Sequence, residues 1–129
     1  MCIFCRIARR EVDAFIVYEN ERVMAFLDIR PLSRGHTLVI PKDHYETILE
    51  IPKDIASDLI DAVKVVCERL KKIGAEGFNI VTNIGGVAGQ EVMHAHIHVI
   101  PRYSKDERPI SFGKPVECDL KEVYELLRS

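Results

Sequence analysis

The chain contains the stretch HAHIHVI at residues 94–100, which holds three of its five histidines. Strict alternation of polar and apolar residues is typical of a β-strand, in which successive side chains point to opposite faces. The pattern predicts a strand with His94, His96 and His98 on one face and apolar residues on the other, toward the core. Three clustered histidines favour a functional face over chance, because histidine serves proton and phosphate chemistry near neutral pH.

The flanking sequence predicts a mixture of strands and helices around this stretch. β-Branched and aromatic residues predict further strands at residues 15–18, 23–27, 37–40 and 78–82. Apolar residues recur every three or four positions from Ile55 to Ile73, which predicts one long helix with Asp54 as its N-cap and Gly74 as its C-terminal cap. Short terminal helices are expected at residues 3–10 and 120–127.

Length and composition indicate a single domain over residues 1–129. The chain is 47% hydrophobic, and its formal net charge of −2 comes from charges of mixed sign. Such a surface does not favour bulk nucleic-acid binding and points to a small ligand or a protein partner. No stretch approaches the roughly 20 apolar residues that span a membrane, and Met1 is not followed by a signal-peptide pattern. We therefore expect a cytoplasmic protein that does not insert into membranes.

Two chemistries are open to the histidine strand. In the first, His94 and His96 bind a catalytic metal whose water attacks the substrate. In the second, one imidazole is the nucleophile and the others donate hydrogen bonds to phosphate oxygens. The second is favoured by the glycine-rich segment just before the strand, whose backbone N–H groups could bind a phosphate; its key residues are Asn83, Gly85, Gly86, Gly89 and Gln90.

The opening of the chain offers a possible metal site. Cys2 and Cys5 have the spacing of a thiolate pair, and His44 and His94 could complete a tetrahedral site. The alternative is that both cysteines pack as small apolar residues on the first helix. Cys67, beside the apolar stripe of the long helix, is expected to be a buried and inert thiol.

On these motifs the chain resembles the histidine-triad (HIT) family, whose signature is His-φ-His-φ-His-φ-φ with φ apolar. Residues 94–100 match it at every position, and residues 3–4, 25–31, 35–42 and 89–92 resemble family blocks in family order. The resemblance covers roughly residues 2–103. It implies an α+β fold built on a five-stranded antiparallel sheet, paired in a homodimer into a continuous ten-stranded sheet.

The resemblance also implies a function and a set of site residues. It implies a hydrolase in which His96 attacks the α-phosphate of an AMP-like purine nucleotide, while His98 contacts that phosphate and His36 orients its neighbours. The substrate would be an adenosine 5′-phosphoramidate or a dinucleoside polyphosphate. The implied substrate-binding residues are Ile3, Phe4, Ile7, Phe26, Asp28, Ile29, Asn83, Gly89, Gln90 and Val92. Asp28 would bind the ribose hydroxyls, although by composition alone Ile7 and Phe26 fit an ordinary core better.

Zinc-containing members of the family imply a structural Zn²⁺ held by Cys2, Cys5, His44 and His94. A closed site of this kind leaves no open position for a metal-bound water, which disfavours the metal hydrolase. His98 stands where nucleotidyl transferases carry glutamine, so transfer is disfavoured too. Glu91 stands where phosphoramidases often carry serine, and the chain has no tryptophan for a C-terminal tail like theirs. A nucleotide-binding regulatory module with little turnover remains an alternative.

Overall fold

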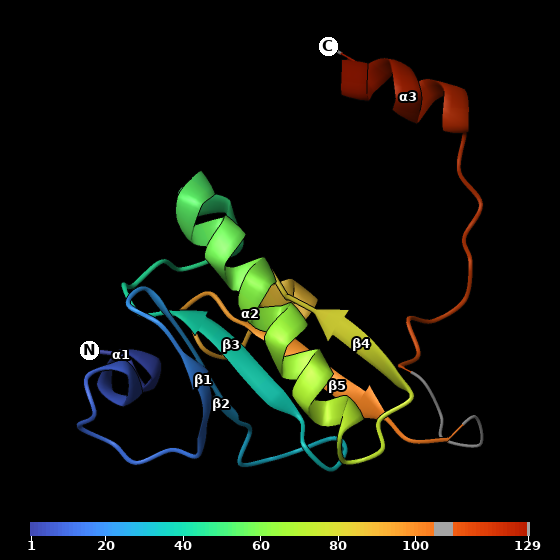
Figure 1. The fold of residues 1–129 in the computed structure, drawn as a ribbon. Coiled ribbons are helices and arrows are strands. Elements are labelled where there is room, and N and C mark those ends of the chain that lie inside the picture. The colour runs from blue at the N-terminus through green and yellow to red at the C-terminus, as the bar shows by residue number, and fades with distance from the viewer. Residues whose placement is uncertain (105–109, 129) are drawn as a thin grey trace.

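The computed structural model describes residues 1–104 and 110–128 of the chain (Figure 1). Five strands form one sheet in the order β1-β2-β3-β5-β4, and every neighbouring pair is antiparallel. The strands are β1 (Ile16–Glu19), β2 (Val23–Leu27), β3 (Thr37–Pro41), β4 (Gly77–Val81) and β5 (Ile97–Arg102). The helices are α1 (Ile3–Ala8), α2 (Lys53–Lys71) and α3 (Leu120–Arg128). The predicted α+β class with a five-stranded antiparallel sheet is confirmed.

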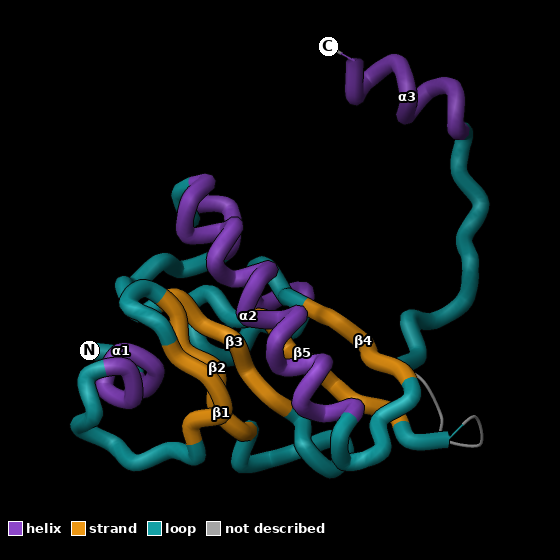
Figure 2. The backbone as a smooth tube through the Cα atoms, in the orientation of Figure 1, coloured by secondary structure: helices purple, strands orange, loops and turns teal. Residues whose placement is uncertain are grey.

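Side chains alternate between two apolar clusters on the two faces of the sheet. In β2, Val23 and Ala25 pack toward α2, whereas Met24 and Phe26 pack in a second cluster with residues of α1. This division follows from the period of two in a strand, since a slip of one residue would exchange the faces. Figure 2 shows α2 running across the sheet and the long loops that join the strands. The two faces therefore carry separate cores.

The long helix begins earlier than its apolar pattern predicts. Pro52 occupies the N-cap of α2 without a side-chain hydrogen bond, and Asp54 lies in the first turn, where its carboxylate pairs with Arg22 at 2.6 Å. The prediction of Asp54 as N-cap is therefore wrong. At the other end the Gly74 N–H donates to the carbonyl of Lys71, and the next N–H donates to that of Leu70. With Gly74 at a φ of 105°, this is the predicted glycine cap.

The histidine strand is shorter than predicted. β5 begins at Ile97, so His94 and His96 lie in the extended segment just before it. The predicted division of faces holds: Ile97 and Val99 pack with α2, while the rings of His96 and His98 lie 5.0 Å apart on the α1 side. The strand starts late because the segment around His94 binds other partners, described below.

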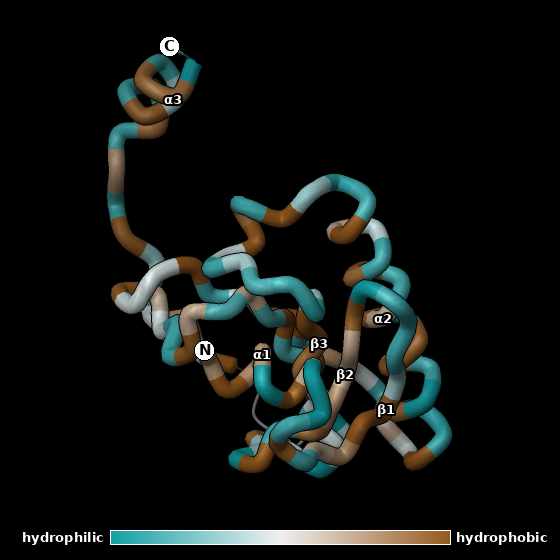
Figure 3. Tube along the Cα trace, turned by 90° about the vertical axis from the view of Figure 1, so that its left-hand side faces the viewer, coloured by the Kyte–Doolittle hydropathy of each residue, from teal (hydrophilic) through white to brown (hydrophobic). Residues whose placement is uncertain are grey.

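The two terminal helices differ in their contacts. Phe4 and Ile7 of α1 are buried in the second cluster. Helix α3 lies apart from the sheet, and its turns alternate between hydrophobic and hydrophilic residues (Figure 3). All of its described residues are exposed. Among the described residues, no helix combines the length and the apolar character required to cross a membrane.

Candidate active site

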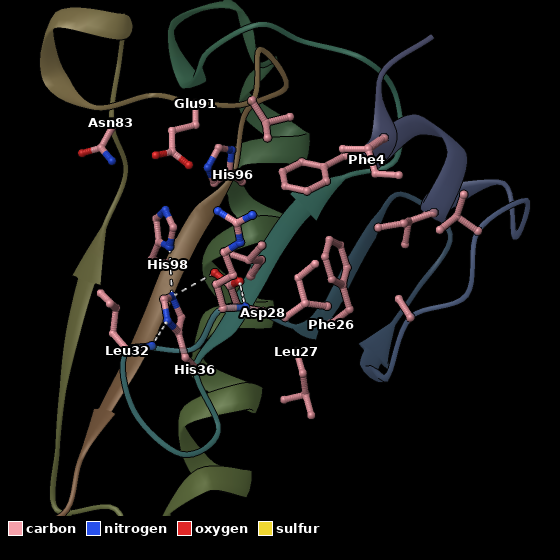
Figure 4. A pocket seen from close by; sticks show the side chains of 18 of the residues that line it. Phe4, Phe26, Leu27, Asp28, Leu32, His36, Asn83, Glu91, His96 and His98 are labelled. Carbon is pink, nitrogen blue, oxygen red and sulfur yellow. Dashed lines mark hydrogen bonds and ion pairs between the residues drawn. The ribbon is translucent and has the colours of Figure 1, made fainter.

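A cavity of about 630 Å³ opens on the α1 face of the sheet. Figure 4 shows the histidines between an aromatic side, with Phe4 and Phe26, and a polar side, with Asn83 and Glu91. The lining includes most residues singled out from the sequence, namely Ile3, Phe4, Ile7, Phe26, Asp28, Ile29, His36, Asn83, Gly89, Val92, His96 and His98. Residues far apart in the chain thus meet at one site.

The aromatic side of the cavity is built by α1 against the sheet. The Phe4 ring packs edge-on against Phe26, with centroids 5.5 Å apart, and against the imidazole of His96 at 5.1 Å. Ile29 lines the same cavity although its side chain is 93% exposed. An apolar wall beside a reactive imidazole suits a planar, weakly polar group such as a nucleobase.

The hydrogen bonds of His96 fix its tautomer. Its Nδ1 lies 2.7 Å from the carbonyl oxygen of His94, and because a carbonyl only accepts, Nδ1 must carry the proton. The Nε2 atom therefore holds the lone pair. The Thr82 hydroxyl donates to the His96 carbonyl at 2.8 Å and fixes the backbone there. A buried imidazole held in this tautomer is equipped to act as a nucleophile.

A chain of hydrogen bonds fixes the tautomer of His98. The Leu32 N–H donates to Nδ1 of His36 at 3.0 Å, so the proton of a neutral His36 is on Nε2. That Nε2 lies 3.0 Å from Nδ1 of His98, to which it donates. His98 is thereby left with its proton on Nε2. Its ring lines the cavity, so this N–H is a donor for an anionic oxygen.

His36 and His98, the two histidines joined by this hydrogen bond, are neutral at pH 7. Burial, together with His96 and His36, lowers the pKa of His98 to about 4. Burial also lowers the pKa of His36, although Asp28 opposes this effect. The donors that His36 and His98 supply are therefore neutral N–H groups.

Asp28 comes directly after β2 and lines the cavity. Its carboxylate already has partners: Oδ1 accepts the Arg30 N–H at 2.8 Å, and Oδ2 lies 3.6 Å from Nε2 of His36. Its position still allows a role in ribose binding.

Gln90 is the one predicted substrate-binding residue that does not line the cavity. Its Nε2 donates to the carbonyls of Glu46 at 2.6 Å and Val92 at 3.0 Å, and its Oε1 accepts the Gly85 N–H at 2.9 Å. The side chain is 4% exposed, and both amide protons are used. In this structure the Gln90 side chain holds the loop before β5, and its predicted phosphate contact stays a prediction.

The glycine-rich loop is also held by internal hydrogen bonds. The N–H groups of Ala88, Gly89 and Gln90 donate to carbonyls within the loop, around a short 3-10 turn at Gly86–Ala88. These amides and that of Gly85 are occupied within the loop, so a phosphate contact from the loop backbone would fall to its other N–H groups and stays a prediction. The cavity also offers side-chain donors, such as Asn83 and His98.

Eight lining residues were not assigned to the site from the sequence, namely Val12, Asp13, Ala14, Leu27, Arg30, Leu32, Leu38 and Glu91. Asp13 and Leu32 lie in connecting segments without a recognisable motif, and Arg30 lies in the family-like block of residues 25–31 with no role assigned to it. Glu91 stood out only as a departure from the family pattern. Its place between Gln90 and Val92, two predicted site residues, was the available signal.

The four predicted metal ligands come together. Each sulfur of Cys2 and Cys5 lies 3.3–3.6 Å from Nδ1 of His44 and of His94. Zinc bonded to sulfur at about 2.3 Å and to nitrogen at about 2.0 Å in a tetrahedron gives sulfur-to-nitrogen edges of about 3.5 Å. Nε2 of His94 lies 2.8 Å from the Pro41 carbonyl oxygen, which orients the ring. The donor set therefore fits a closed zinc site.

The competing metal pair of His94 and His96 is not favoured by this geometry. Among the described residues, no group of three or more possible ligands with donor atoms close enough to share an ion includes His96. Both nitrogens of His94 face other partners. The second such group, Asp28, His36 and His98, is already held together by the contacts described above.

Comparisons with known proteins agree on one family. The family model for the HIT domain matches residues 9–105. An uncharacterized HIT-like protein of Methanocaldococcus jannaschii is 52% identical over 128 residues, covering 99% of both chains. An adenosine 5′-monophosphoramidase of Candida albicans is 38% identical, covering 91% of this chain and 80% of its own. The crystal structure of a HIT family member from Bacillus subtilis superposes with a TM-score of 0.87 at 35% identity, covering 98% of this chain and 92% of that one.

Proposed function

The chain belongs to the HIT family, and from this premise we propose that it hydrolyses a nucleotide at its α-phosphate through a covalent intermediate on His96. The proposal depends on the hydrogen bond that Nδ1 of His96 donates to the His94 carbonyl, because it leaves the lone pair of Nε2 free. Nε2 attacks phosphorus while the bond to the leaving group breaks and its electron pair departs with that group. Water then cleaves the phosphorus–nitrogen bond, releasing the nucleotide and restoring the imidazole.

His98 stabilises the charge on the phosphate oxygens in this scheme. Its Nε2 proton is held in place by the hydrogen bond from His36 at 3.0 Å. A neutral donor fixed before the reaction costs little reorganisation when charge develops on the oxygen. Asn83, which lines the same side of the cavity, supplies a second donor.

The nucleoside would occupy the aromatic side. Phe4, Phe26 and Ile29 supply an apolar wall for a base, and Asp28 lies where a ribose hydroxyl can donate to its carboxylate. The adenosine 5′-monophosphoramidase relative supports an adenosine phosphoramidate as the first substrate to test. A calorimetric comparison of AMP with CMP tests the base preference, with tighter binding of AMP expected.

The test of the reaction is release of AMP from adenosine 5′-phosphoramidate. Wild-type protein should turn the substrate over, and the His96→Ala variant should be slower by at least about 10³-fold. His96→Asn, which retains a side-chain amide donor, is the control for folding and should be equally inactive. Acid-quenched wild type should carry one AMP by intact mass. Activity that survives both substitutions contradicts the proposal, and tight binding without turnover in the wild type would favour the regulatory module.

We also propose a structural Zn²⁺ at Cys2, Cys5, His44 and His94. The distances between the donor atoms support it. Bound zinc would fasten α1, and with it Phe4, to the segment before β5. It would take no part in the bond-breaking step.

A homodimer is the proposed assembly. β4 is an outer strand of the sheet, and its Ile80 side chain is 46% exposed. An outer strand with an exposed apolar residue can pair with its copy and continue the sheet to ten strands. Light scattering should give twice the chain mass, and Ile80→Lys should shift it toward the monomer.

A further inference from the structure

The backbone that carries Glu91 is held by its neighbours. The Gln90 side chain turns inward, where three hydrogen bonds hold it against the loop and against Glu46. Val92 on the other side lines the cavity. The backbone on either side of Glu91 is therefore held in place. Figure 4 shows the Glu91 carboxylate pointing into the cavity between Asn83 and His96.

No positively charged side chain among the described residues pairs with this carboxylate. In the described part of the chain, Glu91 forms no hydrogen bond or ion pair. The charged lining consists of the carboxylates of Asp13, Asp28 and Glu91 against the single guanidinium of Arg30. Because His36 and His98 are neutral at pH 7, the cavity wall carries net negative charge. A site for an anionic nucleotide thus binds its phosphate with neutral donors and surrounds it with negative charge.

Such a wall accepts one phosphate more readily than a chain of them. A single α-phosphate can be held by His98 and Asn83, but each further phosphate adds charge that the carboxylates repel. With the base on the aromatic side, the group on the far side of phosphorus lies toward Asn83 and Glu91. The Glu91 carboxylate would therefore attract a positively charged leaving group and repel a negatively charged one.

We propose that Glu91 is a specificity-determining residue that selects leaving groups carrying a positive charge, so that the substrates are nucleoside phosphoramidates of cationic amines rather than dinucleoside polyphosphates. This inference rests on the function proposed above. In the reaction, Nε2 of His96 bonds to phosphorus as the phosphorus–nitrogen bond breaks. The electron pair stays on the leaving nitrogen, which takes a proton from water. Glu91 attracts a second, protonated amine on that leaving group and undergoes no covalent change.

Three adenosine 5′-phosphoramidates of similar size test the inference, with leaving amines that are cationic (ethylenediamine), neutral (propylamine) and anionic (glycine). The measured quantity is the ratio of kcat/KM for the cationic substrate to that for the anionic one. Comparing this ratio between variants cancels the intrinsic reactivity of each amine. Glu91→Gln should lower the ratio by about tenfold or more, and Glu91→Lys should lower it further.

Glu68→Gln is the matched control, since it removes the same charge from the exposed side of α2, across the sheet from the cavity, and should leave the ratio unchanged. An equal ratio in wild type and Glu91→Gln would overturn the inference. If wild type releases no AMP from any of the three, the proposed reaction fails. In that case calorimetry tests the inference. The His96→Ala variant should bind the cationic compound more tightly than the anionic one, and adding Glu91→Gln must weaken this preference.

Discussion

The Nε2 atom of His36, just before β3, lies 3.0 Å from Nδ1 of His98 in the neighbouring strand β5. His36 immediately precedes β3, whose Leu38 is paired with His98 in β5. This pairing places one imidazole where it sets the proton position of the other. His36 is therefore a positioning residue for His98.

Replacing His36 by alanine should lower kcat/KM for adenosine 5′-phosphoramidate by about 10- to 100-fold, because His98 loses the bond that holds its tautomer. Nitrogen NMR should find the His98 proton on Nε2 in the wild type and shared between both nitrogens in the variant. His36→Gln, whose amide can donate to His98, should recover part of the rate. Unchanged kinetics and an unchanged His98 spectrum in His36→Ala would rule out the positioning role.

The low pKa of His98 predicts a dependence of stability on pH. Its value is about 4 in the folded protein against an ordinary 6.5, so between these pH values the unfolded chain binds a proton that the folded chain does not. The contribution to the free energy of unfolding is therefore complete above about pH 6.5 and is lost as the pH falls toward 4.

Urea denaturation at pH 7.5 and pH 5.0 measures this loss. His98→Gln should lose less stability than wild type between the two pH values, because the variant lacks the titrating group. A residual loss is expected from His36, whose pKa is also lowered by burial. Equal losses in the two proteins would contradict the assignment.

Zinc content and thermal stability should fall together when a ligand is removed. Cys5→Ala should reduce bound zinc, measured by atomic emission, and lower Tm, since the proposed metal would fasten α1 to the segment before β5. A chelator should lower Tm of the wild type in the same way. Cys118→Ala, at an exposed cysteine outside the cluster, is the matched control and should change neither quantity. Equal zinc in wild type and Cys5→Ala would refute the site.

A substitution of Gln90 should lower the stability of the protein, whereas a substitution of Asn83 should lower its activity with little effect on stability. Gln90→Glu replaces an amide that donates to two carbonyls by a carboxylate, so the free energy of unfolding should fall by about 2 to 3 kcal/mol in urea titrations. Asn83→Ala should change it by less than about 0.5 kcal/mol. The activity of Asn83→Ala should nevertheless fall, because a donor that lines the cavity is lost. A stable Gln90→Glu protein would mean that its three hydrogen bonds do not hold the loop.

Side-chain periodicity predicted the fold well where burial on one face controls the structure. The bounds of β2 agree with the prediction, and the pattern from Ile55 to Ile73 identified α2 together with its glycine cap. The start of α2 was missed because Pro52 begins the helix without a side-chain signal, while Asp54 pairs with Arg22 instead. Helix α3 follows its predicted range, but no local pattern indicated that its described residues would all be exposed.

The site was predicted where residue type alone determines the chemistry and missed where hydrogen bonding decides. The triad and the four possible metal ligands are recognisable from their side chains. The roles of Gln90 and of the loop amides depend on which donors are already occupied, and this depends on carbonyls such as that of Glu46, 44 residues away. The late start of β5 likewise follows from the contact of His94 with Pro41, which no local pattern contains.

Core residues and cavity residues alternate along β5, and this alternation affects how rigidly the histidines are held. Ile97 and Val99 are buried against α2, while His98 between them and His96 just before them face the cavity. The imidazoles are therefore carried by backbone that cannot shift without disrupting the core, and their proton positions are set by carbonyl and amide groups of that same framework. In the proposed reaction the dipoles of the site would be aligned before the transition state, so little reorganisation of the protein would be needed. Mutations that loosen the α2 core should then slow the reaction before they unfold the chain.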